Sequence, residues 1–153
     1  LIKVETADQM FKATQNNLPT DVAIFAAAVA DYKIKEEKKE KIKKQEYASL
    51  DLEKNIDILN YISNHNSLRP KLVIGFAAET NDLIVNAEKK LMEKNCDWII
   101  ANDVSNKNIG FNSNFNEVKI LYKDSKVDNE MLHMKEKSAI SDEIVDRVVS
   151  HLS

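Results

Sequence analysis

Glycine and cysteine are both scarce in this chain of 153 residues, and each shortage excludes a class of site. The chain has two glycines, Gly75 and Gly110, where a usual content of about 7% would give roughly eleven. Two glycines this far apart form neither a dinucleotide-binding fingerprint nor a P-loop. The single cysteine, Cys96, excludes an intramolecular disulfide and a cysteine-built zinc site. A nucleotide would therefore need another binding device, or a glycine-rich part outside this sequence.

Long apolar runs and a surplus of positive charge are also missing. No run approaches the roughly 20 residues that a membrane helix needs, and the charged first residues do not resemble a signal peptide. Lys and Arg total 22 against 25 Asp and Glu, so the formal net charge is −3. Binding to duplex nucleic acid requires clustered surplus cations. We therefore expect a cytoplasmic protein that binds neither a membrane nor nucleic acid.

The remaining composition suits one folded domain over residues 1–153, because 43% of residues are hydrophobic and 31% are charged. Short apolar runs alternate with segments of helical periodicity, which is typical of an α/β domain. Strands buried on both faces are predicted at 22–29, 72–76 and 98–101. The alternation of Val118, Ile120 and Tyr122 predicts an antiparallel strand near the C-terminus. The predicted fold is a three-layer, Rossmann-like α/β domain with a mainly parallel sheet.

Helix-start signals and apolar stripes define four helices. The predicted starts are, in chain order, a capping box from Thr6 to Gln9, Asn55, Thr80 or Asn81, and Ser138. The third helix carries the stripe Leu83, Ala87 and Leu91. The last helix is predicted to bury Ile140, Ile144, Val145, Val148, Val149 and Leu152 on one face. A short edge strand is expected around Leu50 and Leu52.

Polar or glycine-marked sequence follows three of the predicted strands, at 28–32, 75–80 and 101–105. Ligands of open parallel sheets bind at the carboxyl ends of the strands, so we expect the three loops to face one crevice. Asp31 could bind ribose hydroxyls or a metal ion there, or it could cap a turn. Gly75 permits a close backbone approach or an unusual backbone dihedral angle. Phe76 could stack on a base or belong to the core.

Two groups of lysines and the single cysteine each allow two interpretations. Lys90 and Lys94 project from one helical face and could hold phosphates, although pairing with Glu93 in solvent is the ordinary interpretation. Residues 33–49 are rich in lysine and form either a solvated loop or a mobile cationic flap that closes over a polyphosphate. Cys96 is interpreted as a small buried hydrophobe rather than a nucleophile.

Six motifs, in order, resemble those of phosphopantothenate–cysteine ligase. They are AAAVADY (26–32), KIKK (41–44), KNIDI (54–58), GFAAET (75–80), ANDV (101–104) and GFNS (110–113). The resemblance implies that CTP activates the carboxylate of 4'-phosphopantothenate as an acyl-cytidylate. L-cysteine then displaces CMP, giving 4'-phosphopantothenoylcysteine for coenzyme A biosynthesis. It further implies Mg²⁺, a homodimer, and FMN only if a decarboxylase module lies upstream.

The resemblance also implies which residues form the site. Lys41, the first lysine of KIKK, is the implied catalytic residue, whose charge stabilises phosphate oxygens in the transition state. The implied nucleotide contacts are Phe25, Ala26, Ala27, Asp31, Lys41, Ile56, Asp57, Ile58, Leu59, Phe76, Lys90 and Lys94. Ala30 and the intact KIKK motif resemble the relatives that use CTP rather than ATP. The resemblance identifies no metal ligand.

The chain departs from the family pattern in two ways. Ile56 stands where the family commonly has proline, which makes the start of that turn less rigid. The family's glycine-rich amino-terminal segment is absent from this sequence, so we expect an amino-terminally truncated synthetase domain that is inactive or severely impaired alone. The alternative is a non-catalytic α/β fragment that serves in dimerisation or nucleotide binding. Half of a Rossmann-type oxidoreductase or methyltransferase is a third possibility, which the glycine content disfavours.

Overall fold

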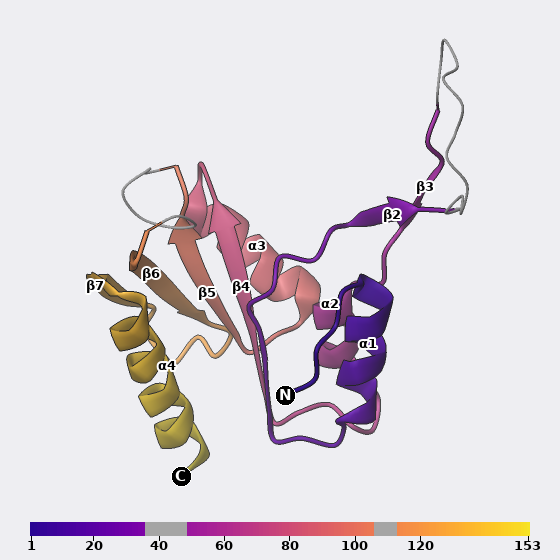
Figure 1. Cartoon of the computed structure of the whole chain (residues 1–153). Helices are drawn as coiled ribbons and strands as arrows, with labels where there is room; N and C mark the ends of the chain where they lie inside the picture. Colours follow the sequence, from indigo (N-terminus) through magenta and orange to yellow (C-terminus); the bar gives the residue numbers. More distant parts are fainter. Residues whose placement is uncertain (36–48, 106–112) are drawn as a thin grey trace.

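The computed structural model describes residues 1–35, 49–105 and 113–153, and it contains one five-stranded sheet with helices on both faces (Figure 1). The strands of this sheet, in spatial order, are β1 (Val22–Phe25), β4 (Leu72–Glu79), β5 (Trp98–Asp103), β6 (Phe115–Tyr122) and β7 (Glu130–Glu136). The first three are parallel, and β6 is antiparallel to both β5 and β7. The helices are α1 (Ala7–Asn16), α2 (Ile58–Ser63), α3 (Leu83–Lys94) and α4 (Lys137–Leu152).

Helices cover both faces of the sheet and give the predicted three layers. On one face, Ile140 and Ile144 of α4 pack against strand residues that include Ile100 and Ile120. On the other face, α3 contributes the buried residues Ala87 and Leu91, while Leu59 of α2 packs against the same cluster. The fold prediction is therefore confirmed. The strand β7 was not predicted, because its sequence EMLHMKE buries only Leu132 and lacks a continuous apolar pattern.

The prediction for residues 22–29 is wrong in both length and burial. The strand β1 ends at Phe25, and Ile24 within it is 47% exposed. Among the described residues β1 pairs only with β4, so it is an edge strand and lacks neighbours on its outer side. After Phe25 the chain leaves the sheet, and the small residues from 26 to 30 are exposed.

A two-stranded arm leaves the body of the molecule next to β1 (Figure 1). It pairs β2 (Tyr32–Ile34) with β3 (Leu52–Lys54) in an antiparallel ladder that is separate from the main sheet. Lys33 of the arm forms an ion pair with Asp8 of α1 at 2.7 Å. Because they pair with β3, Lys33 and Ile34 belong to a strand rather than to a loop. The expected edge strand near Leu52 is part of this arm. Residues 36–48, with most of the predicted flap, lie outside the described residues.

Three of the four predicted helix starts are displaced by one or two residues. The capping box of α1 is confirmed, since Thr6 accepts a hydrogen bond from the Gln9 amide and Gln9 reaches back to Thr6. The cap of α2 is Asp57 instead of Asn55, because the Asn55 side chain is bonded to the chain after β1. The residue before α3 is Asp82, in a left-handed conformation with φ of 48° and no side-chain cap. The last helix, α4, begins at Lys137, one residue before Ser138.

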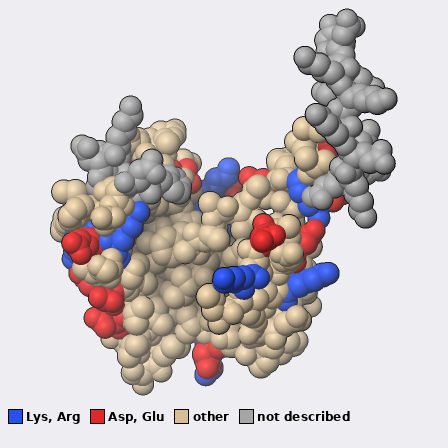
Figure 2. All heavy atoms as spheres, in the orientation of Figure 1, with Lys and Arg blue, Asp and Glu red and all other residues tan. Residues whose placement is uncertain are grey.

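The helix α4 buries a narrower face than predicted. Ile140, Ile144 and Val148 are buried at four-residue spacing, whereas Val145, Val149 and Leu152 are 52%, 58% and 45% exposed. The buried residues pack against the sheet, and within the described part of the chain the outer side of the apolar stripe stays exposed. Figure 2 shows a broad uncharged area on the body of the molecule, with charged side chains to the left and to the right of it. None of the helices in the described ranges has the length and apolarity to cross a membrane.

Arg69 connects four parts of the structure through one guanidinium group. It donates hydrogen bonds to the carbonyl of Ser63 at the end of α2 (2.7 Å) and to the carbonyl of Asn95 after α3 (3.1 Å). It also pairs with both carboxylate oxygens of Asp97, at 3.0 and 3.1 Å. The same carboxylate accepts a 2.7 Å hydrogen bond from the Val73 amide in β4. Arg69 therefore holds α2, α3 and the starts of two strands together.

We expect Arg69→Lys to lower the free energy of unfolding by about 2 kcal/mol, because an ammonium group cannot replace the planar fork and leaves partly buried acceptors unpaired. Urea unfolding followed by circular dichroism measures the loss. Lys71→Gln breaks the exposed Lys71–Asp21 pair and is the control, with an expected change below about 0.5 kcal/mol. Equal losses in the two variants would contradict the connecting role of Arg69.

Candidate functional site

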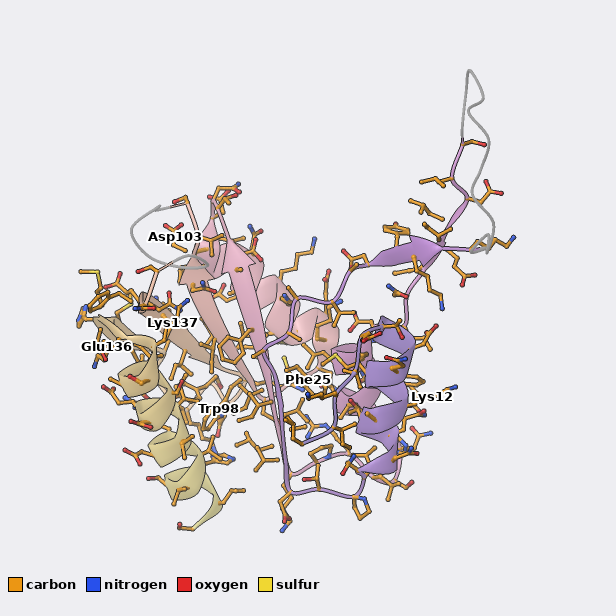
Figure 3. All side chains as sticks on the ribbon, viewed as in Figure 1. Lys12, Phe25, Trp98, Asp103, Glu136 and Lys137 are labelled. Atoms are coloured by element: carbon orange, nitrogen blue, oxygen red, sulfur yellow. The ribbon has the colours of Figure 1, made fainter. Side chains whose placement is uncertain are left out.

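The candidate site is a pocket at the carboxyl end of β1, between the sheet, the helices α2 and α3, and the base of the arm. Its lining residues are Met10, Phe25, Ala27, Val29, Ala30, Asp31, Lys54, Asn55, Ile56, Asp57, Ile58, Leu59, Phe76, Lys90 and Lys94. Figure 3 shows Phe25 on the inner side of β1, on the side of the molecule that carries α1 and α2. The pocket thus combines aromatic rings, two carboxylates and several lysines.

Gly75 allows α2 to lie directly against the strand β4. A Cβ atom at this position would lie 2.7 Å from Leu59 Cδ2 and 2.9 Å from Ile99 Cδ1, both closer than normal packing permits. The close approach at Gly75 is made by side chains, which occupy the space that a Cβ atom would take. It brings Leu59, and with it the start of α2, to the wall of the pocket.

An ion pair between Asp57 and Lys94 joins α2 to α3 at the pocket. One oxygen of Asp57 accepts a 2.9 Å hydrogen bond from the Asn60 amide, and the other contacts the Lys94 ammonium group. Burial raises the pKa of Asp57, but the hydrogen bonds from Lys94 and Asn60 outweigh it and hold the pKa below the ordinary value of 3.8. In the absence of a ligand, the positive charge of Lys94 is therefore neutralised locally.

The structure does not pair Lys90 and Lys94 with Glu93 in solvent, which was the ordinary interpretation of these two lysines. Glu93 lies 3.8 Å from Lys89 and not beside Lys94. Lys90 and Lys94 both line the pocket, and within the described part of the chain no ion pair involves Lys90. Two ammonium groups near an incoming anion can act as point charges for phosphate.

The two phenylalanines serve the core and the pocket together. Phe76 packs against the α4-side cluster and Phe25 against the α3-side cluster, and both are only partly buried. The two interpretations of Phe76, as core and as a surface for a ligand, are therefore compatible. Asp31 lies beyond the end of β1, and its carbonyl accepts a 2.8 Å hydrogen bond from the Asn55 amide.

The structure brings most of the predicted nucleotide contacts together. The residues that line the pocket are Phe25, Ala27, Asp31, Ile56, Asp57, Ile58, Leu59, Phe76, Lys90 and Lys94. Ala26 lies between two of them but does not line the pocket. Lys41 lies outside the described residues, so its predicted role stays a prediction.

The expectation that three loops share one crevice is wrong for residues 101–105. It is also wrong for most of residues 75–80, because the strand β4 continues to Glu79 and only Phe76 of this segment lines the pocket. In the register of the sheet, Phe25 is opposite Gly75, while β4 and β5 continue together to Glu79 and Asp103. The strand β1 therefore ends part-way along the sheet, and Figure 3 shows Asp103 at the far upper end of β5. Hydrogen bonds from the Ser105 side chain and from the Ser105 amide, the latter at 2.8 Å, lower the pKa of the Asp103 carboxylate.

Five lining residues were not predicted as site residues: Met10, Val29, Ala30, Lys54 and Asn55. Lys54 and Asn55 belong to the KNIDI motif, which was the available signal. Asn55 was assigned to the helix cap because asparagine is a frequent cap residue. Met10 comes from α1, and no local pattern distinguishes it from a core residue.

The described residues contain neither a three-ligand metal site nor a reactive thiol. Among residues 1–35, 49–105 and 113–153, no three histidine, cysteine or acidic side chains are grouped as a metal site. Cys96 is buried, and burial raises the pKa of its thiol to about 11, so it is protonated at neutral pH. The interpretation of Cys96 as a buried hydrophobe is confirmed.

The fold and pocket define a Rossmann-like α/β domain with a cation-lined pocket at a strand end. The chain belongs to the family described as DNA/pantothenate metabolism flavoprotein C-terminal domain, whose model matches residues 1–152. The structure also resembles a crystal structure of the C-terminal domain of the coenzyme A biosynthesis bifunctional protein CoaBC, at 32% identity and a TM-score of 0.72. That match covers 99% of this chain and 65% of the solved chain.

Curated relatives have the same name as the protein in that crystal structure. The chain is 41% identical over 149 residues to the coenzyme A biosynthesis bifunctional protein CoaBC of Borreliella burgdorferi, covering 95% of this chain and 36% of the relative. It is 34% identical over 154 residues to CoaBC of Escherichia coli K12, covering 97% and 37%. The chain thus spans little more than a third of these relatives. A flavoprotein from Streptococcus pneumoniae shares the fold, with a TM-score of 0.71 at 18% identity.

We expect Asp57→Asn to make the chain less sensitive to acid. Asparagine retains the helix cap but not the charge that pairs with Lys94. Because the pKa of Asp57 is lowered in the folded state, its stabilisation is present above pH 3.8 and is lost as the pH falls through the lower folded value. The variant should lose about 0.5 kcal/mol at pH 7 and little at pH 2.5, as measured by urea unfolding. Asp21→Asn, at an exposed pair, is the control. A loss of equal size at both pH values would contradict the ion-pair explanation.

Proposed function

We propose that this chain is the nucleotide-binding part of a CTP-dependent phosphopantothenate–cysteine ligase. The observation that carries the proposal is the pocket, in which ten of the twelve residues matched to family nucleotide contacts lie together. The family match and the CoaBC relatives support the same reaction. The enzyme would join 4'-phosphopantothenate to L-cysteine through an acyl-cytidylate and release pyrophosphate.

The pocket suggests an orientation for the nucleotide. The nucleoside would lie against Phe25, Ala27 and Asp31, beside Phe76, because this end combines flat apolar surface with hydrogen-bonding groups. The triphosphate would lie toward Asp57, where Lys90 and Lys94 supply positive charge. The incoming phosphates would compete with the Asp57 carboxylate for Lys94, and this exchange would release the ion pair.

Mg²⁺ fits the donors that the pocket offers. Magnesium in nucleotide sites is commonly bound by one or two carboxylates together with substrate phosphates and water. Of the two carboxylates that line this pocket, Asp57 lies at the proposed triphosphate end and would hold it. When bound, the ion would offset triphosphate charge. The charge of Lys41 would stabilise phosphate oxygens as the acyl-cytidylate forms.

The test of this function is CTP-dependent pyrophosphate release with 4'-phosphopantothenate and Mg²⁺, before cysteine is added. The assay uses this chain extended by the glycine-rich segment that lies upstream in the family. ATP is the nucleotide control. Lys41→Ala should lower the rate at least about 100-fold. Lys38→Ala, in the same lysine-rich stretch but outside KIKK, should change it less than twofold. Pyrophosphate release with ATP but not with CTP would contradict the proposal. Equal effects of the two variants on the rate would also contradict it.

We further expect the chain of residues 1–153 by itself to bind CTP but to release no pyrophosphate. Isothermal titration calorimetry measures the binding, and the same assay measures turnover. Turnover by this chain alone would overturn the expected impairment. A folded chain that binds no nucleotide would instead support a role limited to dimerisation.

A further inference from the structure

Asn55 carries an unpartnered oxygen at the wall of the candidate pocket. The residue is 9% exposed and lines the pocket, two positions before Asp57 in the chain. Its Nδ2 group donates a 2.8 Å hydrogen bond to the Ala30 carbonyl, and its backbone amide donates one of 2.8 Å to the Asp31 carbonyl. The side-chain oxygen Oδ1 is shielded from water and accepts no hydrogen bond from any described residue.

The orientation of the Asn55 amide is determined by its neighbours. Turning the amide over would place Oδ1 against the Ala30 carbonyl, where two acceptors would repel each other. The amide therefore keeps its nitrogen toward Ala30 and its oxygen without an internal donor. Buried acceptors of this kind are uncommon in folded proteins, because the lost hydration is not replaced. A ligand that supplies a donor would remove this mismatch.

The chemistry of an amide oxygen limits which part of a nucleotide it can contact. An ionised triphosphate has no hydrogen to donate, and its oxygens would repel Oδ1. The groups suited to phosphate in this pocket are the ammonium groups of Lys90 and Lys94. The uncharged donors of a cytidine nucleotide are its sugar hydroxyls and the exocyclic amine of its base.

We propose that Asn55 Oδ1 accepts a hydrogen bond from an uncharged donor on the nucleoside half of the nucleotide, either a sugar hydroxyl or the base amine. Asn55 then takes part in recognising the nucleoside half of the nucleotide, and this role rests on the proposed function. Because Oδ1 is shielded before binding, the pocket wall must shift slightly to admit the donor, as side chains at binding surfaces commonly do.

The experiment measures, by isothermal titration calorimetry with Mg²⁺, how this chain binds CTP and three analogues that each lack one donor. The analogues are 2'-deoxy-CTP, 3'-deoxy-CTP and the pyrimidin-2-one ribonucleoside triphosphate, which lacks the amine. Each is titrated into wild type, Asn55→Ala and Asn81→Ala. Asn81 is an exposed asparagine that does not line the pocket, so its variant is the matched control.

We expect removal of one of these donors to weaken binding to wild type about tenfold beyond any general effect. Asn55→Ala should bind CTP about tenfold more weakly and should no longer distinguish CTP from that analogue, whereas Asn81→Ala should match wild type. The identity of the analogue distinguishes a hydroxyl from the amine.

Two results would overturn the role of Asn55 and leave the proposed function standing. One is wild-type protein that binds all four nucleotides equally, a result that needs no variant. The other is an Asn55→Ala variant that binds all four more weakly by the same factor. A folded wild type that binds no CTP would overturn the proposed function and this inference with it.

Discussion

The hydrogen bonds of Arg69 are the interaction on which the arrangement of the site depends. This side chain bonds to Ser63 at the end of α2 and to Asn95 just after α3, and it pairs with Asp97 at the start of β5. Because α2 has only six residues, fixing its last residue also fixes its first. The ion pair of Asp57 with Lys94, one residue before Asn95, spans the same two helices. One guanidinium group thus links the two helices beside which Asp57 and Lys94 meet.

Charge and hydrogen-bonding capacity are distributed unequally over the resulting pocket. Its helix side offers Lys90 and Lys94, the latter neutralised by Asp57 until another anion arrives. Its strand side offers the phenyl rings of Phe25 and Phe76 and the unpaired oxygen of Asn55. One end therefore suits a polyanion and the other an uncharged ring with donors. This arrangement is complementary to a nucleoside triphosphate, and it is the physical basis of the proposed function.

Much of the fold could be predicted from sequence, because its central part obeys local rules. The strands β4 and β5 are continuous apolar runs, and Ala87 and Leu91 follow strict helical spacing. The errors arise where distant contacts decide the structure. Ile24 looks buried by composition but lies on an edge strand, and Asn55 looks like a helix cap but is bonded to Ala30. Most site residues were found through motif resemblance, since the spacing of Lys90 and Lys94 alone favours solvent. The unpaired oxygen of Asn55 requires coordinates to be found.

A crystal structure of this chain with CTP and Mg²⁺ tests the central claim most directly, because it locates both ends of the ligand. The account predicts the triphosphate beside Lys90 and Lys94, with the Asp57–Lys94 pair opened, and the nucleoside between Phe25 and Asp31 within reach of Asn55. CTP bound at the far end of β5 around Asp103, or bound in the pocket in the reverse orientation, would contradict it.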